Sequence, residues 1–277
     1  MRRALPWLTL RFQVYALCRS EEQALALRQL GVLPVQGDLD QPDTLGRLVG
    51  LAEYVLHSAP PPNQGEDDPR SKRLMAVLGQ AAILARGLCY ISTTGVYGDC
   101  GGALLDESHP LRPQSARALR RVAAERTLRG LGKRGCRVSI LRAPGIYAAD
   151  RLPLERLRSG TPALQPSEDG YSNHIHADDL AHAACLALFR GRPGRVYHAC
   201  DDSDWKMGDW FDKVADAHGL PRPLRLPAAE VERSVSPALW SFMRESRRLK
   251  NRRLRQELRL RLAYATPQVL LDQLRKS

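Results

Sequence analysis

The sequence has no apolar run of the roughly 20 residues that a bilayer-spanning helix needs. Its N-terminal apolar stretch is broken by Pro6, Thr9 and Arg11 and is followed by no small-residue cleavage site, so we expect no signal peptide. The 6 cysteines form no C-x-x-C pair, and most lie in apolar runs, where a free thiol packs as a small hydrophobic side chain. These absences predict a reduced, cytoplasmic protein without structural zinc.

What the sequence does contain is an ordinary globular composition with an excess of arginine. Its 277 residues are 43% hydrophobic and 26% charged, enough to bury one large core with a small appendage. The net charge of +12 indicates an anionic partner, either nucleic acid or a phosphorylated cofactor, or no specific partner at all.

Short apolar runs alternate with longer segments of helical periodicity. We expect strands at 14–18, 35–39, 54–57, 88–92, 137–142 and 195–199, and helices at 21–30, 44–51, 70–86, 116–131 and 178–189. Strands separated by helices at this spacing predict right-handed crossovers and an α/β fold, a Rossmann-like doubly wound parallel sheet. We expect the core to comprise 1–146, continued by 172–202, and a small lid or substrate subdomain to comprise 147–171 and 203–277.

The segment after the strand at 88–92 reads S-T-T-G-V-Y-G, from Ser92 to Gly98. It resembles the hydroxyl-bearing motif of the extended short-chain dehydrogenase/reductase superfamily, the NAD-dependent epimerase/dehydratase-like type. The resemblance implies that Thr93 hydrogen-bonds the reacting oxygen of a small carbonyl or sugar-like substrate.

Further segments resemble the same superfamily in the expected order. They are G-D-L at 37–39, H-S-A-P at 57–60, L-R-A-P-G-I-Y at 141–147 and H-I-H-A-D-D-L-A at 174–181. The resemblance implies an NAD or NADP cofactor. It also implies cofactor contacts from Arg19, Asp38, Leu39, Ser58, Ala59, Pro60, Thr93, Pro144, Gly145 and Ile146.

Arg19 directly follows the strand expected at 14–18, which corresponds to the second strand of the superfamily. In that superfamily the adenosine 2′-position of the cofactor lies beside the end of this strand. An acidic residue there favours NAD, whereas an arginine accommodates the additional phosphate of NADP. The sequence therefore favours NADP, and a solvated arginine is the alternative.

The chain departs from the superfamily at its catalytic pair. A tyrosine and a lysine four residues apart normally share one helix face, but the matching positions are Arg117 and Arg121. A guanidinium stays protonated and cannot replace the phenol, although Arg121 can position a ribose or phosphate. Tyr97 is the nearest phenol by sequence. The function is therefore either redox or epimerase-like chemistry with impaired catalysis, or that of a non-catalytic NAD(P)-responsive binding or regulatory protein.

The opening of the chain is the second departure. Residues 2–11 resemble the helix that follows the first strand and glycine-rich turn of a dinucleotide-binding unit. We expect that central strand, between those at 14–18 and 54–57, to be missing from the sequence as given. This expectation implies weak dinucleotide binding, because the turn supplies the pyrophosphate site.

Two other features have ordinary interpretations. His174 and His176 alternate onto one strand face, but we expect packing rather than metal binding, with Asp178 or Asp179 capping the next helix. The basic stretch at 244–261 is a nucleic-acid-binding candidate, but its leucine stripe favours a packed lid helix. Nucleic-acid binding is therefore a third function.

Overall fold

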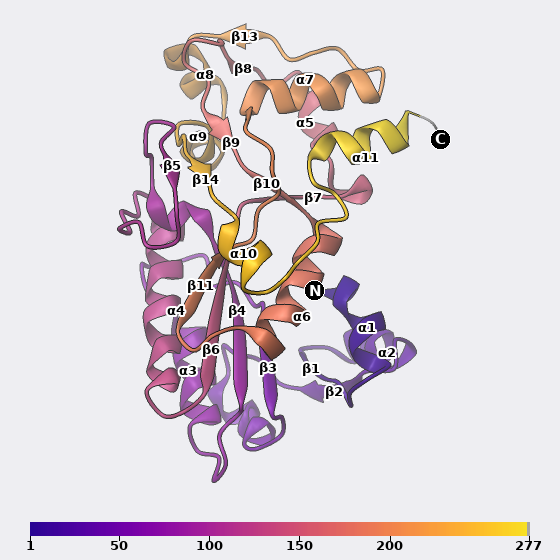
Figure 1. The fold of residues 1–277 in the computed structure, drawn as a ribbon, viewed down its shortest axis with the longest axis vertical. Helices are drawn as coiled ribbons and strands as arrows, with labels where there is room; N and C mark the ends of the chain where they lie inside the picture. Colours follow the sequence, from indigo (N-terminus) through magenta and orange to yellow (C-terminus); the bar gives the residue numbers. More distant parts are fainter. Residues whose placement is uncertain (276–277) are drawn as a thin grey trace.

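The centre of the molecule is a four-stranded parallel sheet in the order β11-β6-β4-β3 (Figure 1). The computed structural model describes residues 1–275. The strands are β3 (Tyr54–His57), β4 (Gly87–Thr93), β6 (Arg137–Ala143) and β11 (Arg195–His198). Strands β4 and β6 are buried along almost their whole length, which explains why they read as continuous apolar runs.

Helices cover both faces of this sheet. On one face, α3 (Pro69–Leu78) and α4 (Ala116–Gly132) pack on a core that includes Leu88, Tyr90 and Ile140. On the other face, α6 (Ala177–Arg190) packs on Cys89, Leu141 and Tyr197. Successive strand residues thus point to opposite helical layers. The predicted Rossmann-like, doubly wound α/β class is confirmed.

A second, two-stranded parallel sheet lies beside β3. It consists of β1 (Tyr15–Cys18) and β2 (Leu33–Gln36), connected by α2 (Glu21–Gln29). Within residues 1–275, β1 pairs with β2 alone and β3 pairs with β4 alone. The two sheets are therefore not joined by a strand ladder.

The N-terminal residues form two helical turns against α6. These turns are η1 (Arg2–Ala4) and α1 (Leu5–Thr9), and their buried Ala4 and Leu8 pack on Ala181 and Cys185 of α6. The expected N-terminal helix is therefore present. It lies close to the edge of β3.

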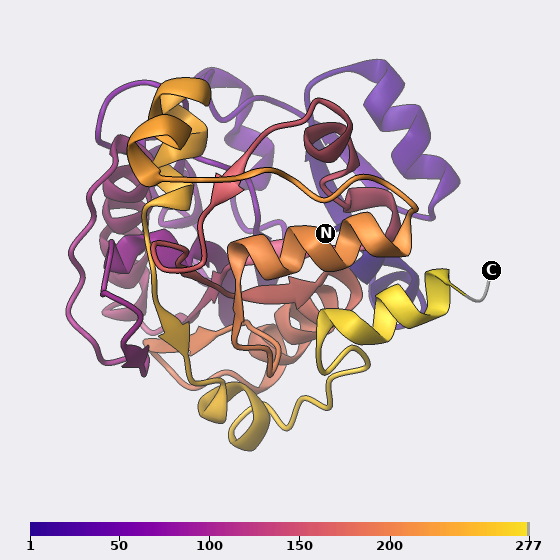
Figure 2. The ribbon, with the colours of Figure 1, turned by 90° about the horizontal axis from the view of Figure 1, so that it is seen from above.

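Smaller elements cover the carboxyl ends of the strands (Figures 1 and 2). They comprise α5 (Leu154–Arg158), α7 (Met207–Ala217), α8 (Ala228–Ser234), α9 (Pro237–Met243), α10 (Arg252–Gln256) and α11 (Pro267–Leu274), the 3-10 turns η4 (Thr94–Tyr97) and η5 (Ala149–Arg151), and the short strands β5 (Leu104–Leu105), β7 (Gly145–Tyr147), β8 (Ala163–Leu164), β9 (Tyr171–Ser172), β10 (His174–His176), β12 (Trp205–Lys206), β13 (Arg225–Leu226) and β14 (Arg248–Leu249). Helices α5, α7 and α11 share an apolar cluster that includes Trp210 and Leu271.

Two predicted helices are shorter than expected. The helix expected at 70–86 ends at Leu78, where Arg134 Nη2 donates to the carbonyl of Gly79 at 2.9 Å. The helix expected at 44–51 is instead two 3-10 turns, η2 (Pro42–Thr44) and η3 (Gly46–Leu48). Leu45 between those turns is fully buried, so tertiary packing rather than helical periodicity fixes this segment.

The prediction of a single helix at 244–261 is wrong. The segment forms β14, which pairs with β5, and the five-residue helix α10. Its leucines at 254, 258 and 260 are buried against α6 and β11, as the leucine stripe suggested. Strand pairing at Leu249 takes precedence over helical continuity. Within residues 1–275, no helix is both long and apolar enough to cross a membrane.

Candidate functional site

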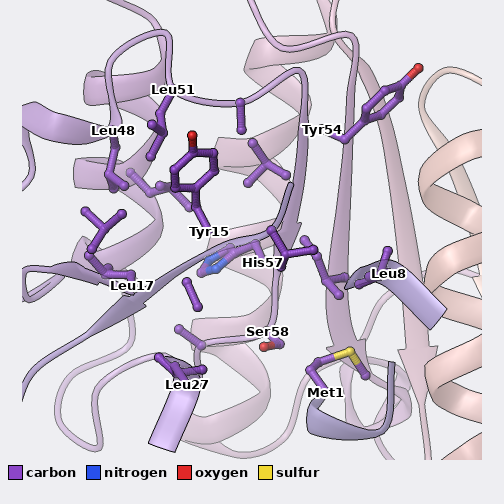
Figure 3. A pocket seen from close by; sticks show the side chains of 18 of the residues that line it. Met1, Leu8, Tyr15, Leu17, Leu27, Leu48, Leu51, Tyr54, His57 and Ser58 are labelled. Carbon is purple, nitrogen blue, oxygen red and sulfur yellow. The ribbon is translucent and has the colours of Figure 1, made fainter. Parts of the chain in front are cut away.

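A cavity of about 480 Å³ separates β1 from β3. Its lining is mostly apolar and comes from β1, β3, α3 and the N-terminal turns. In Figure 3, Tyr15 and Leu17 of β1 lie on one side, and Met1 and Leu8 lie on the other. The cavity therefore lies between an edge strand of the two-stranded sheet and an edge strand of the four-stranded sheet.

A second pocket of about 250 Å³ opens at the carboxyl ends of β1 and β2. It joins residues that are far apart in the sequence, and it shares Leu17, Leu39 and Ala59 with the larger cavity. Five of the sequence-predicted cofactor residues line it: Arg19, Asp38, Leu39, Ala59 and Pro60. The sixth adenosine-side candidate, Ser58, lines the larger cavity instead.

The floor of this pocket is fixed by a tight turn after β2. Gly37 is required there, because a Cβ would lie 2.8 Å from the carbonyl oxygen of Thr44. Thr44 Oγ1 accepts from the backbone N–H of Asp38 at 2.9 Å, and Asp38 Oδ1 accepts from the N–H of Asp40 at 2.9 Å. The motif G-D-L is therefore a rigid turn that presents Asp38 to the pocket.

The charged groups at the rim are unevenly paired. Arg70 donates to both carboxylate oxygens of Asp40 and to the carbonyl of Pro60, and its hydrogen bonds lower the pKa of Asp40. The exposed guanidinium of Arg19 has no hydrogen bond or ion pair to any residue in 1–275. Arg19 is thus free to bind an anion at this rim. Arg70, which the sequence analysis missed, instead links Asp40 to the carbonyl of Pro60 and stabilises the pocket.

The nicotinamide-side candidates meet at the ends of β4 and β6. Thr93 pairs in register with Ala143, which precedes Pro144, Gly145 and Ile146. The side chain of Thr93 is half-buried and accepts from the N–H of Gly95 at 3.3 Å, which begins the turn η4. The structure therefore groups Thr93 with this second segment at the carboxyl ends of β4 and β6.

Tyr97 does not face an open site. Its side chain has no exposed surface, and its hydroxyl lies 2.6 Å from Arg142 Nη1 and 2.5 Å from His198 Nε2. Burial raises the pKa of Tyr97 to about 12, although the charge of Arg142 acts in the opposite direction. The phenol is a member of a closed network.

The centre of that network is a buried ion pair. Arg142 donates to both oxygens of Glu125, at 3.1 and 2.8 Å, and Ser92 donates to Glu125 at 2.7 Å. Burial raises the pKa of Glu125, but the hydrogen bonds from Arg142 outweigh it and keep this pKa below its usual value. Sequence reasoning missed this pairing. The available signal was an arginine within the apolar run at 137–142, which requires a buried counter-charge.

The two positions of the absent catalytic pair lie on α4. Arg121 Nη1 donates to the hydroxyl of Tyr90 at 3.0 Å and to the carbonyl of Ile91 at 2.9 Å. The guanidinium of Arg117 lies over the ring of Phe242 in α9, 3.4 Å from its centroid. Neither position carries a group that can exchange a proton near neutrality.

A series of buried contacts leads from Tyr90, the partner of Arg121, to the start of α3. Tyr90 packs on the ring of His57, with ring centroids 5.0 Å apart, and His57 Nε2 lies 2.9 Å from Ser71 Oγ. Ser71 in turn donates to Asp68, the cap of α3, at 2.5 Å. Burial, followed by the charge of Arg121, lowers the pKa of His57 to about 4. His57 is therefore neutral at pH 7 and structural.

The histidines of β10 pack as aromatic side chains. The rings of both His174 and His176 meet Tyr147 edge-on. The expected helix cap is wrong, because His176 Nδ1, rather than an aspartate, accepts from the N–H of Asp178 at 3.2 Å. Asp179 instead accepts from two N–H groups after α10, those of residues 263 and 264. This stretch connects the sheet to its C-terminal covering.

Comparison with known proteins supports this architecture. No protein-family model matches the chain. A curated ketoreductase from Stigmatella aurantiaca, named for 4-hydroxy-2-methyl-3-oxo-4-farnesyl-3,4-dihydroquinoline-1-oxide, is 26% identical over 246 residues. The match covers 82% of this chain and 73% of that protein.

Solved structures cover nearly the whole chain. A conserved protein of unknown function from Silicibacter pomeroyi is 28% identical with a TM-score of 0.78, covering 99% of this chain and 93% of that one. A dTDP-glucose 4,6-dehydratase from Streptomyces venezuelae, solved with NAD bound, is 19% identical with a TM-score of 0.74, covering 95% and 86%. These likenesses confirm the fold that the resemblance to the epimerase/dehydratase-like short-chain dehydrogenase/reductase superfamily implies.

Proposed function

We propose that this protein binds a nicotinamide dinucleotide along the carboxyl ends of its strands. The observation that carries the proposal is the pocket that joins Arg19, Asp38, Leu39, Ala59 and Pro60 from three separate segments. Ligands of open α/β sheets bind outside the carboxyl ends of the strands. The adenosine lies in this pocket, and the nicotinamide lies towards Thr93 and residues 144–146.

The unpaired guanidinium of Arg19 supports NADP over NAD. It lies at the pocket rim without an ion-pair partner in residues 1–275. A planar guanidinium binds a phosphate through two parallel hydrogen bonds. Arg70 does not compete for this role, because Asp40 already neutralises it.

The reaction that fits this arrangement is a redox step on a small carbonyl or sugar-like substrate. When bound, a reduced nicotinamide supplies the hydride. The hydroxyl of Thr93, at the end of β4, donates a hydrogen bond to the reacting oxygen of the substrate. The elements of 147–171 and 203–277 act as the lid that covers the substrate. The ketoreductase name of the curated relative supports carbonyl chemistry.

A non-catalytic NAD(P)-responsive protein is the second candidate. The specific observation in its favour is that Arg117 occupies the tyrosine position and that Tyr97 is enclosed by Arg142 and His198. Activity assays separate the two candidates. Oxidation of NADPH by a panel of ketones, aldehydes and sugar nucleotides supports the enzyme, and binding without turnover supports the responsive protein.

The cofactor proposal is tested at its adenosine end alone. We expect 2′,5′-ADP, which carries the 2′-phosphate, to bind at least about 10-fold more tightly than 5′-AMP in calorimetric titrations, since one charge-assisted contact contributes about 1.5–3 kcal/mol. Arg19→Ala should remove this preference. Arg47→Ala, an exposed arginine outside the pocket, should retain it. Equal affinities for both nucleotides in the unmodified protein would refute NADP specificity, and no binding of either would refute the site.

A further inference from the structure

Three arginines share one face of α4 at its first two turns. Arg117, Arg120 and Arg121 are spaced i, i+3 and i+4, which places their side chains side by side on a helix. Arg120 is only 9% exposed, and Arg117 and Arg121 are half-buried. The face they form points away from bulk solvent, towards the end of β4 and the covering elements.

None of these arginines has a carboxylate partner among residues 1–275. Arg120 donates to the carbonyl of Gly65 at 2.6 Å, and Arg121 donates to a hydroxyl and a carbonyl. The guanidinium of Arg117 lies over the ring of Phe242 and makes no side-chain hydrogen bond within residues 1–275. This differs from other buried arginines, such as Arg142, whose charge is matched by a carboxylate.

The carboxylates nearest to this face are already engaged. Glu245 accepts from Arg247 at 2.9 Å, and Glu125 holds Arg142 and Arg129. Asp68 caps α3 and accepts from Ser71. Among residues 1–275, no acidic side chain forms an ion pair with the arginines of this face, and Glu245 attracts Arg117 only at longer range.

The electrostatics of Arg117 show the resulting excess of positive charge. Burial lowers the pKa of Arg117, and the charges of Arg247, Arg120 and Arg121 lower it further, against the single opposing influence of Glu245. The guanidinium nonetheless stays protonated. Positive groups in a partly desolvated site are costly unless an anion joins them.

The geometry of Arg117 suits it to receive such an anion. The guanidinium carbon of Arg117 lies 3.4 Å from the ring centroid of Phe242, and its N–H groups, which make no hydrogen bond within residues 1–275, can donate to an anion. Phe242 belongs to α9, one of the covering elements, and Arg121 bonds the carbonyl of Ile91, two residues before Thr93. The face is therefore near the proposed reaction centre.

We propose that Arg117 and Arg121, supported by the buried charge of Arg120, bind a carboxylate or phosphate group of the substrate. This inference rests on the proposed function, since it assigns the substrate class of the same site. The position that carries the proton-transfer phenol in related proteins is here part of an anion-binding site. The substrate is accordingly an acidic carbonyl compound or a phosphorylated one.

The test uses inorganic phosphate and malonate as probes, each compared with chloride at equal ionic strength. In the unmodified protein, either probe at about tenfold its Kd should raise Tm by about 3–5 °C. Arg117→Gln should lose most of this shift. Arg126→Gln, an exposed arginine on the same helix, should keep it. Near-ultraviolet circular dichroism in chloride confirms that both variants are folded.

The alternative source of the anion is the cofactor itself, and a second arm distinguishes it. The probe shift is repeated with NADPH at saturation. An additive shift supports a substrate anion, whereas loss of the shift assigns the arginines to the cofactor and overturns the proposal. An equal shift in Arg117→Gln and Arg126→Gln, or none in the unmodified protein, also overturns it. Failure of NADPH to bind refutes the proposed function, and the phosphate comparison still decides the anion site.

Discussion

The two sheets of this protein differ in how completely their strands are partnered. In the four-stranded sheet, β4 and β6 have neighbours on both sides, and the Glu125–Arg142 pair lies within that closed core. In the two-stranded sheet, β1 has one neighbour and a cavity of about 480 Å³ on its other side. Of the proposed adenosine-side residues, Arg19 and Asp38 follow strands of the two-stranded sheet and Ala59 and Pro60 follow β3, whereas the proposed nicotinamide-side residues all lie at or after the ends of strands of the four-stranded sheet.

The comparison teaches that the proposed cofactor site is divided between a rigid part and a loosely attached part. A fully paired, close-packed strand resists local opening, whereas a strand with an unpaired edge and few buried contacts opens at a lower free energy. Thr93 therefore has a fixed position, whereas that of Arg19 depends on how β1 is held beside the cavity.

The largest expected effect is the loss of the buried ion pair. Arg142→Met should lower the free energy of unfolding by about 3–5 kcal/mol, because Glu125 then loses its buried two-point partner and keeps only Ser92 and the partly exposed Arg129. The matched change in the other sheet, Arg28→Met, removes an exposed pair with Glu21 and should cost under about 1 kcal/mol. Urea unfolding measures both. Equal losses would contradict the contrast between the sheets.

Removal of a leucine side chain gives a smaller contrast. Leu88→Ala in β4 empties a fully buried position and should cost about 3–4 kcal/mol. Leu17→Ala in β1 enlarges a cavity that already exists beside a half-buried side chain, and should cost about 1 kcal/mol. Chemical denaturation of the two variants tests this, and a larger loss at Leu17 would show that β1 is firmly packed.

The smallest expected effect, counted per pH unit, is the pH dependence of the free energy of unfolding that comes from Asp201, shortly after β11. Burial raises the pKa of Asp201 from 3.8 to about 7 in the folded protein, although its hydrogen bonds from Ser203 act against this. Because the folded state retains the proton, the contribution of Asp201 to stability is fully present below pH 3.8 and is lost as pH rises towards 7.

The corresponding slope is at most about 1.4 kcal/mol per pH unit in that window. Asp201→Asn keeps the oxygen that accepts from Ser203 and should remove this part of the slope. Unfolding free energies measured at pH 5, 6 and 7 provide the check. An identical pH profile in the variant would show that other groups control the dependence.

Several elements were predictable because their local signals agree with their packing. The strand at 54–57 has the predicted bounds, and the helix expected at 116–131 is α4, one residue longer. In α4, apolar periodicity and burial coincide. The pocket residues at 38–39 and 59–60 could be named only through the resemblance of their segments to the epimerase/dehydratase-like superfamily.

The incorrect predictions share a different origin. The basic stretch at 244–261 has helical periodicity, yet Leu249 pairs with β5, which lies about 140 positions earlier in the sequence. The helix cap expected at Asp178 or Asp179 is His176 in the structure. Asp179 accepts hydrogen bonds from the backbone at 263–264 instead. Partners distant in sequence decided both, and no local pattern contains them.

The sequence alone therefore determined the α/β class, the order of the strands along the chain and the residue types at their carboxyl ends. Those features follow from hydrophobic period and turn chemistry, which are local. Only the tertiary structure decided that Tyr97 is buried against Arg142 and that Arg117, Arg120 and Arg121 lie close together with no ion pair to a carboxylate in residues 1–275. Desolvation and charge pairing depend on which segments meet in space, and that is fixed only when the whole chain has packed.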